Sequence, residues 1–184
     1  MATYSGGVAD VSVRPARAAD AERVARVQLA TWRTAYADLL PADALALPEE
    51  QVAAVWLNAI EAPRSARHRV LVALERDELV GFVASTPADE APLDPATTAE
   101  VTALLVEPRW GRRGHGARLL AAAVDGWRAD GVATAVAWAW ESDPATRSFL
   151  SSAGWEPDGA RRGLDTGSGV QPQLRLHVDV REDA

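Results

Sequence analysis

The chain is organised around residues 100–120, which read EVTALLVEPRWGRRGHGARLL. The apolar run from Val101 to Val106 is short and rich in β-branched residues, a pattern typical of a buried strand. Pro108 ends that strand, because proline has no N–H group to donate to a neighbouring strand. Leu119 and the apolar residues after it recur at three- and four-residue steps, which predicts a helix. The stretch therefore predicts a strand, a sharp turn and a helix in succession.

The turn in this stretch has the chemistry of an anion-binding site. Gly114 and Gly116 allow a tight turn and the close approach of a ligand. The first N–H groups of a helix have no partner inside it, the helix dipole favours an anion there, and Arg112 and Arg113 add positive charge. The turn lacks the Gly-Lys-Ser/Thr of a Walker A loop and the third glycine of a dinucleotide-binding fingerprint. We predict a site for phosphate or pyrophosphate, with a merely close-packed turn as the alternative.

Two segments resemble sequence motifs of the GNAT superfamily of N-acetyltransferases. Residues 106–120 read V-x-P-x-x-x-x-x-G-x-G-x-x-L-L and are similar to motif A, with Gly111 where that family usually has Gln or Arg. Residues 142–155, SDPATRSFLSSAGW, are similar to motif B, with Asp143 at the usual asparagine position and Leu150 where tyrosine is usual. In that family motif A holds the pyrophosphate of acetyl-coenzyme A. The resemblance therefore implies an acetyl-coenzyme A-dependent N-acetyltransferase.

The remaining periodicities predict a fold of the α/β (α+β) class. The expected order is strand, two helices, three strands, helix, strand, helix and two strands, which makes a mixed sheet with helices on its faces. The GNAT fold has the same order, so the resemblance implies a mostly antiparallel, twisted sheet with helices on both faces. Asp20 is expected to cap the first helix, and Val55 to lie on the apolar face of the second. Residues 1–10 are expected to form a flexible leader, and residues 11–184 a single GNAT-like domain.

Composition limits the classes of protein that fit. The chain has 184 residues, of which 48% are hydrophobic and 24% are charged, as in a globular domain. Its formal net charge of −7 argues against a broad nucleic-acid-binding surface. No apolar run is long enough to span a bilayer, the first residues do not read as a signal peptide, and the absence of cysteine fits a reducing compartment. We therefore expect a cytoplasmic protein with no membrane or nucleic-acid partner.

The resemblance also implies where the acyl donor binds. In the family, the strand before the turn parts from its neighbour, and its free backbone groups hold the pantetheine and the acetyl group. The residues expected to contact acetyl-coenzyme A are Leu104, Leu105, Val106, Arg112, Arg113, Gly114, His115, Gly116, Ala117, Asp143 and Leu150. His115 would contribute its backbone N–H group rather than its imidazole. His68 and His177 have no partners at metal-ligand spacing, so no metal is expected.

Acyl transfer to an amine sets three tasks: aligning the reactants, stabilising the carbonyl oxygen and removing a proton from the amine. Glu100 is the best candidate base, because several members of the family carry a glutamate there, although a solvated carboxylate at a strand edge is the alternative reading. Glu141 is a weaker candidate. Leu150 cannot protonate the departing thiolate as the usual tyrosine does, which leaves Tyr36 and Tyr4 to replace it. A coenzyme A thiolate is also a tolerable leaving group at neutral pH without such help.

The acceptor is expected to be a primary amine of a small molecule or a peptide. Trp32, Tyr36 and Trp138 are the candidate substrate-binding residues, and the alternative is that all three are core aromatics. The oligomeric state is open, and a homodimer is one of the choices. A non-catalytic acyl-coenzyme A-binding regulatory module on the same fold is the alternative function, favoured by the missing tyrosine. A nucleotide-phosphate binder of unrelated fold is a third.

Overall fold

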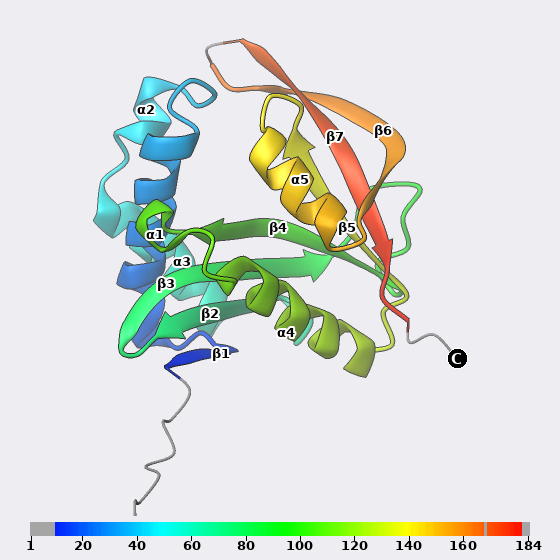
Figure 1. Cartoon of the computed structure of the whole chain (residues 1–184), viewed down its shortest axis with the longest axis horizontal. Helices are drawn as coiled ribbons and strands as arrows, with labels where there is room; N and C mark the ends of the chain where they lie inside the picture. Colours follow the sequence, from blue (N-terminus) through cyan, green and yellow to red (C-terminus); the bar gives the residue numbers. More distant parts are fainter. Residues whose placement is uncertain (1–9, 168, 182–184) are drawn as a thin grey trace, which may run out of the picture.

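The computed structural model describes residues 10–167 and 169–181 (Figure 1). Tyr4 and all of the predicted leader except Asp10 lie outside the described residues. The strands are β1 (Val11–Pro15), β2 (Arg69–Glu75), β3 (Glu78–Pro87), β4 (Thr98–Val106), β5 (Thr134–Trp140), β6 (Glu156–Asp165) and β7 (Val170–Asp179). The helices are α1 (Ala21–Ala35), α2 (Ala42–Leu45), α3 (Glu49–Glu61), α4 (His115–Ala129) and α5 (Pro144–Ser152). Two 3-10 turns precede α1 and α4, namely η1 (Ala18–Asp20) and η2 (Pro108–Trp110).

The strands form one seven-stranded sheet in the order β1-β2-β3-β4-β5-β7-β6. Every neighbouring pair is antiparallel except β4 and β5, which are parallel and joined by the crossover helix α4. The predicted fold class, a mixed and mostly antiparallel twisted sheet with helices on its faces, is confirmed. The one parallel pair lies at the centre of the sheet, and the turn that the sequence singled out follows the C-terminal end of β4.

Helices cover both faces of the sheet, with α1 and α3 on one face and α4 on the other (Figure 1). Leu119 and Trp127 of α4 belong to the core cluster on one face, together with Val101 of β4. On the other face Val24 of α1 packs with Phe82 of β3 in a second cluster. Because the side chains of a strand alternate between faces, β4 contributes to both cores and is buried between the two helical layers.

The first helices differ from the prediction in two places. The short helix α2 was not predicted, because four residues are too few to show a helical period. Val55 of α3 was expected on the apolar face, but 68% of it is exposed. The buried residues of α3 are Val52 and Ala53, and the contacts of this helix are mostly with α1. With one main packing partner, α3 buries a narrower stripe than the periodicity of its apolar residues suggests.

Asp20 stands at the N-cap position of α1, as predicted, but its side chain accepts no capping hydrogen bond from that helix. Its carboxylate instead accepts from the backbone N–H of Arg17 (2.8 Å) and from the guanidinium groups of Arg14 (2.6 Å) and Arg23 (2.8 Å). The turn η1 places it before the helix and turns it toward β1. Only 1% of Asp20 is exposed, and the hydrogen bond from Arg14 lowers its pKa to about 2. Asp20 therefore joins the start of α1 to β1 as a buried ionic hub.

Candidate active site

The turn between β4 and α4 contains two residues in the left-handed conformation. Arg112 has φ 61° and Gly114 has φ 81°. That conformation costs a residue other than glycine on the order of 1–2 kcal/mol, and backbone strain of this kind concentrates at functional sites. Gly114 offers no side chain to cap α4, and the first helical hydrogen bond runs from Arg118 N–H to the Gly114 carbonyl (3.1 Å). The N–H groups of residues 115–117 precede that bond and are in position to donate to an anion.

Two side chains of the turn are held by the protein itself. Arg113 donates from Nη1 to Glu75 Oε1 (2.9 Å), and its Cζ lies 4.8 Å from the centroid of the Trp110 ring. The His115 side chain is 1% exposed, and its Nε2 lies 2.9 Å from Glu75 Oε2. The charge of Arg113 is therefore balanced by Glu75, and the buried His115 has only its backbone to offer a ligand. Arg112 is exposed and makes no ion pair with the described residues, so it is the turn cation that stays available.

Gly116 fixes the distance between α4 and α5. A Cβ atom at Gly116 would lie 3.3 Å from Cζ of Phe149 and 3.9 Å from Cγ2 of Val106. The first is closer than most such contacts, so a larger residue here would push α5 away from the turn. Phe149 is partly buried against the α4-side core cluster as well as against Gly116. The two motifs recognised in the sequence thus touch each other in the fold.

Before the chain reaches the turn, β4 and β5 part from each other. They pair only over Thr98–Val101 and Thr134–Ala137, although each strand continues farther. On the other side of β4, the register with β3 shifts so that Thr102 is an extra residue, which makes a bulge. The backbone groups of Leu104 and its neighbours that point away from β3 therefore have no strand partner among the described residues. An opening lined by free N–H and C=O groups results, as the resemblance to the family implied.

A cavity of about 550 Å³ lies at this opening, between α1, β4, β5, α5 and β6. Seven of the predicted site residues line it: Trp32, Tyr36, Leu104, Leu105, Trp138, Asp143 and Leu150. Val106 and Glu100 do not line it, because Val106 lies nearer the turn and Glu100 precedes the bulge. The structure thus brings residues of both motifs and of the first helix to one place. It also separates them from the turn residues 112–117, which lie at the start of α4.

Glu100 is half-buried on the strand immediately before the cavity. It lies opposite Thr86 of β3 and Val136 of β5 in the sheet register. Burial raises the pKa of its carboxyl group, the nearby Arg162 and Arg175 counteract this rise, and the nearby Glu90 and Asp89 reinforce it. A carboxylate with a raised pKa is a stronger base than an ordinary one. Its position and its environment are therefore those expected of a group that accepts a proton.

Tyr36 and Leu150 face the same cavity from different helices. Leu150 is 3% exposed and belongs to both the core and the cavity wall. Tyr36, at the end of α1, lies beside Asp143 and Thr146 at the start of α5; burial raises the pKa of its phenol. Asp143 caps α5, since its Oδ1 accepts from the Thr146 N–H (3.0 Å) and its Oδ2 from the Thr146 hydroxyl (2.6 Å). Tyr36 is thus a protonated donor at neutral pH, and it lines the same cavity as Leu150, which has no such group.

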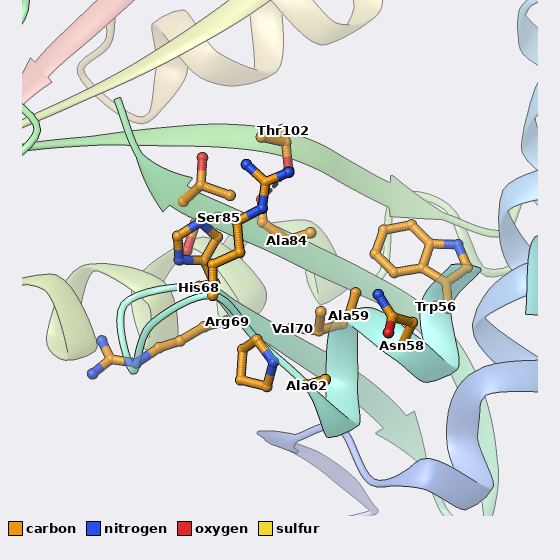
Figure 2. Close-up of a pocket in the computed structure, with 13 residues that line it drawn as sticks. Trp56, Asn58, Ala59, Ala62, His68, Arg69, Val70, Ala84, Ser85 and Thr102 are labelled. Atoms are coloured by element: carbon orange, nitrogen blue, oxygen red, sulfur yellow. Dashed lines mark hydrogen bonds between the residues drawn. The ribbon is translucent and has the colours of Figure 1, made fainter. Parts of the chain in front are cut away.

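A second, smaller cavity of about 210 Å³ lies between α3 and strands β2 and β3 (Figure 2). Figure 2 shows His68 and Ser85 at one side of it and Trp56 at the other. Trp56 and Thr102 line both cavities, so the smaller one adjoins the larger at the bulge of β4. The indole N–H of Trp56 donates to Gln28 Oε1 (2.7 Å), which fixes the ring between the two spaces.

The family model of the acetyltransferase (GNAT) family matches residues 29–155. The chain therefore belongs to the GNAT acetyltransferase family. No curated protein matches the sequence of the chain.

Solved structures of similar fold agree with this assignment. YncA of Salmonella typhimurium, solved with acetyl-coenzyme A, superimposes with a TM-score of 0.72 at 18% identity, covering 95% of this chain and 96% of the other. The PaiA N-acetyltransferase of Thermoplasma acidophilum, solved with coenzyme A, has a TM-score of 0.71 at 18% identity, with 92% and 98% covered. The ribosomal-protein-S18-alanine N-acetyltransferase of Escherichia coli has a TM-score of 0.64 at 17% identity, with 95% and 96% covered. At such identities these likenesses show the shared fold.

Sequence reasoning missed several residues of the site. Thr102 is the bulge residue, Trp56 divides the two cavities, and Arg162 of β6 lines the larger one. Arg118 was also missed, although its guanidinium lies beside Gly114 at the turn. Its position one helical turn after Gly114 is the one signal in the sequence that would have found it.

The described part of the chain lacks two further kinds of feature. No helix there is long and apolar enough to cross a bilayer. No group of three or more His, Asp or Glu side chains is close enough to hold a metal ion within residues 10–167 and 169–181.

Proposed function

We propose that this chain is an acetyl-coenzyme A-dependent N-acetyltransferase that acetylates a primary amine of a small molecule or a peptide. One observation carries the proposal: β4 runs from the cavity that opens where β4 and β5 part toward the uncapped start of α4. A phosphate-binding turn and a row of free strand groups then lie in sequence along β4. An acyl donor with a charged end and an amide-containing arm suits that arrangement.

The residues of the turn fit the pyrophosphate end of the donor. The N–H groups of residues 115–117 would donate to its oxygens, and the exposed guanidinium groups of Arg112 and Arg118 would add charge. The arm of the donor would extend along β4, where the backbone of Leu104 has no partner from β5. The acetyl group would then reach the cavity lined by Tyr36 and Leu150. Acetyl-coenzyme A supplies the thioester carbonyl that the amine attacks.

In the proposed reaction the amine nitrogen forms a bond to the thioester carbonyl carbon, and the carbon–sulfur bond breaks. Glu100 accepts the proton that the ammonium must lose, directly or through a water molecule, because its pKa is raised by burial. A backbone N–H of β4 that lacks a strand partner would stabilise the negative charge on the carbonyl oxygen. Tyr36 would give a proton to the departing thiolate and regain one from the nitrogen as the amide forms, and Glu100 would release its proton to solvent. The products are then the N-acetylated amine, the free thiol of coenzyme A and one proton.

The assignment of Tyr36 answers the difficulty raised by Leu150. Leucine has no hydroxyl group, whereas Tyr36 approaches the same cavity from α1 and stays protonated because burial raises its pKa. The raised pKa also makes it a weaker acid than an ordinary tyrosine, so its contribution would be modest. Departure of the thiolate without assistance is the limiting case, since a thiol pKa of about 8.5 makes a tolerable leaving group.

The alternative function is a regulatory module that binds acyl-coenzyme A without turnover, and the hydrocarbon side chain of Leu150 favours it. The two functions are separated by measuring thiol release from acetyl-coenzyme A with a panel of primary amines, in parallel with coenzyme A binding. Acetyltransferase activity predicts release that depends on the amine and saturates with it. Tight binding with no amine-dependent release from a wide panel would favour the module instead. A monomer or homodimer and a cytoplasmic location stay predictions of the sequence.

A further inference from the structure

One wall of the larger cavity carries an arginine stacked on a tryptophan. Arg162 of β6 lies over the ring of Trp138 of β5, with its Cζ 4.2 Å from the ring centroid. Its Nε donates to Gln173 Oε1 of β7 (2.7 Å). All three residues line the cavity. The stacking and the hydrogen bond together fix the plane of the guanidinium group. An arginine side chain at a strand surface otherwise has no fixed orientation.

Trp138 is itself held in place by neighbouring side chains. Arg175 of β7 lies on the same ring at 5.6 Å and donates from Nε to Asp158 Oδ2 (2.6 Å). The indole N–H of Trp138 donates to Glu90 Oε2 (3.2 Å). The charge of Arg175 is therefore balanced by Asp158, and Trp138 is a fixed platform. These contacts leave Arg162 as the cation that the platform presents to the cavity.

The two terminal nitrogens of Arg162 have no hydrogen-bond or ion-pair partner among the described residues. A guanidinium group with its Nε already bonded still offers a pair of N–H donors in one plane, the geometry that matches a carboxylate. Asp143 also lines the cavity, but it is engaged in capping α5. The cavity thus contains one oriented positive charge that the protein does not neutralise. Aromatic rings of Trp32, Trp56 and Trp140 line the same space.

The candidate base lies on the same face of the sheet. Glu100 is opposite Val136, and Trp138 is two residues farther along β5, so the side chains of Glu100 and Trp138 project to one side. Glu100 and Arg162 form no ion pair with each other. Arg162 lines the cavity and Glu100 lies on β4 just before it, so a ligand that spans the two positions can place a group of opposite charge beside each.

We propose that the acceptor is an amino acid, whose carboxylate is bound by Arg162 while its amine is directed to Glu100 and its side chain packs against the cavity tryptophans. This inference rests on the proposed function, because it names the acceptor of the same site. An oriented arginine on an aromatic platform specifies a carboxylate, and the surrounding indole rings specify an apolar or aromatic side chain. A primary amine without a carboxylate would leave Arg162 unpaired and would bind more weakly.

The test compares amines that differ only in the carboxylate. Phenylalanine with phenethylamine, and tryptophan with tryptamine, form two matched pairs. The expected kcat/KM of the wild-type protein is at least about 10-fold higher for the carboxylate-bearing member of each pair, since a hydrogen bond to a charged group contributes that much or more. Arg162→Gln should lower the preference for amino acids, measured as the ratio of kcat/KM for the amino acid to kcat/KM for the simple amine, by about 10- to 100-fold, chiefly through the KM of the amino acid.

Two further variants serve as controls. Arg162→Lys keeps the charge but loses the planar fork, so it should restore only part of the preference for amino acids. Arg161→Gln changes the neighbouring arginine, which forms an ion pair with Glu141 outside the cavity. This variant should not change kcat/KM for the amino acid or for its matched amine. An equal loss for amino acids and simple amines in Arg162→Gln, or a wild-type preference for simple amines or for peptides, would overturn the proposal.

Binding of the products separates this inference from the proposed function. N-acetylphenylalanine should bind the coenzyme A complex more tightly than N-acetylphenethylamine in calorimetry, and Arg162→Gln should remove that difference. If this holds and no amine is acetylated, the carboxylate site stands and the catalytic proposal fails. If amines are acetylated with no carboxylate preference and neither product is favoured, the catalytic proposal stands and the carboxylate site fails.

Discussion

Replacing Gly114 with glutamate tests the phosphate-binding turn most directly. The residue has φ 81°, and a Cβ atom there would lie 3.3 Å from Nη1 of Arg118, the movable end of a long side chain. The backbone strain, about 1–2 kcal/mol, is present with and without ligand, so it lowers stability rather than affinity. The new carboxylate acts on affinity. At about 5 Å from a phosphate it costs about 1 kcal/mol in water and about 3 kcal/mol at an effective dielectric constant of about 20.

These energies predict a loss of about 10- to 100-fold in coenzyme A affinity, at about 1.4 kcal/mol for each factor of ten. Titration calorimetry measures it directly. Thermal unfolding provides a second readout, because ligand at about 100 times its Kd stabilises the native state by about 2.7 kcal/mol, and most of that stabilisation should disappear in the variant.

Gly131 offers a matched control at the other end of α4. It has φ 74°, and nothing lies within 4 Å of a Cβ atom placed there. Gly131→Glu therefore brings the same strain and the same charge without approaching the turn, and it should lower stability while leaving the Kd for coenzyme A unchanged. Wild-type affinity in Gly114→Glu, or an equal loss in Gly131→Glu, would refute the assignment of the turn as the phosphate site.

Three other predictions follow from the site and the fold. Glu100→Gln should lower kcat/KM by about a hundredfold at pH values below the pKa of the acceptor amine, and by less at high pH. The affinity for coenzyme A should not change. If the variant is as active as the wild type at every pH, Glu100 has no part in the mechanism. Tyr36→Phe should lower kcat several-fold, and Leu150→Tyr in that background should restore part of it, whereas no effect of either change would mean that the thiolate leaves unaided. The pKa of Asp20 is lowered from 3.8 to about 2, so Asp20 contributes about 2 kcal/mol to the free energy of unfolding above pH 4, and this contribution is lost as the pH falls toward 2. Asp20→Asn should therefore destabilise the protein at neutral pH. In denaturant titrations, the free energy of unfolding of the variant should fall less between pH 4 and pH 2 than that of the wild type.

Local patterns in the sequence were sufficient for the elements that depend on neighbouring residues. The helix α5 begins at Asp143 and Pro144, a capping residue and a proline at the first position, both of which act within one turn. Gly131 has the positive φ that is typical of a glycine just after a helix. The exposure of Val55 could not be predicted, since it depends on how much of α3 the neighbouring helix covers. The role of Asp20 was missed because its partners include Arg14, on a different element.

The parts of the site that depend on sheet register could not be predicted from the sequence. The bulge at Thr102 arises from a shift between β3 and β4, and no residue type marks it. Arg162 and Trp138 are 24 positions apart on strands that are not neighbours, because β7 lies between β5 and β6. Their contact follows from the order of the strands, which local periodicity does not determine. By contrast, the tight turn itself could be predicted from its glycines, because a turn needs particular dihedral angles rather than a distant partner.

The parting of β4 and β5 gives the sheet four edges instead of two. Two of them, on β1 and β6, are outer edges, as in any open sheet. The other two are interior and diverge from a four-residue ladder that ends at Val101 and Ala137. An outer edge is open to any extended chain, and proteins guard it against such pairing. The interior edges diverge at an angle between helices, so a strand of another protein cannot pair with both. They suit instead a narrow, flexible molecule whose own amide groups can pair with the free backbone groups.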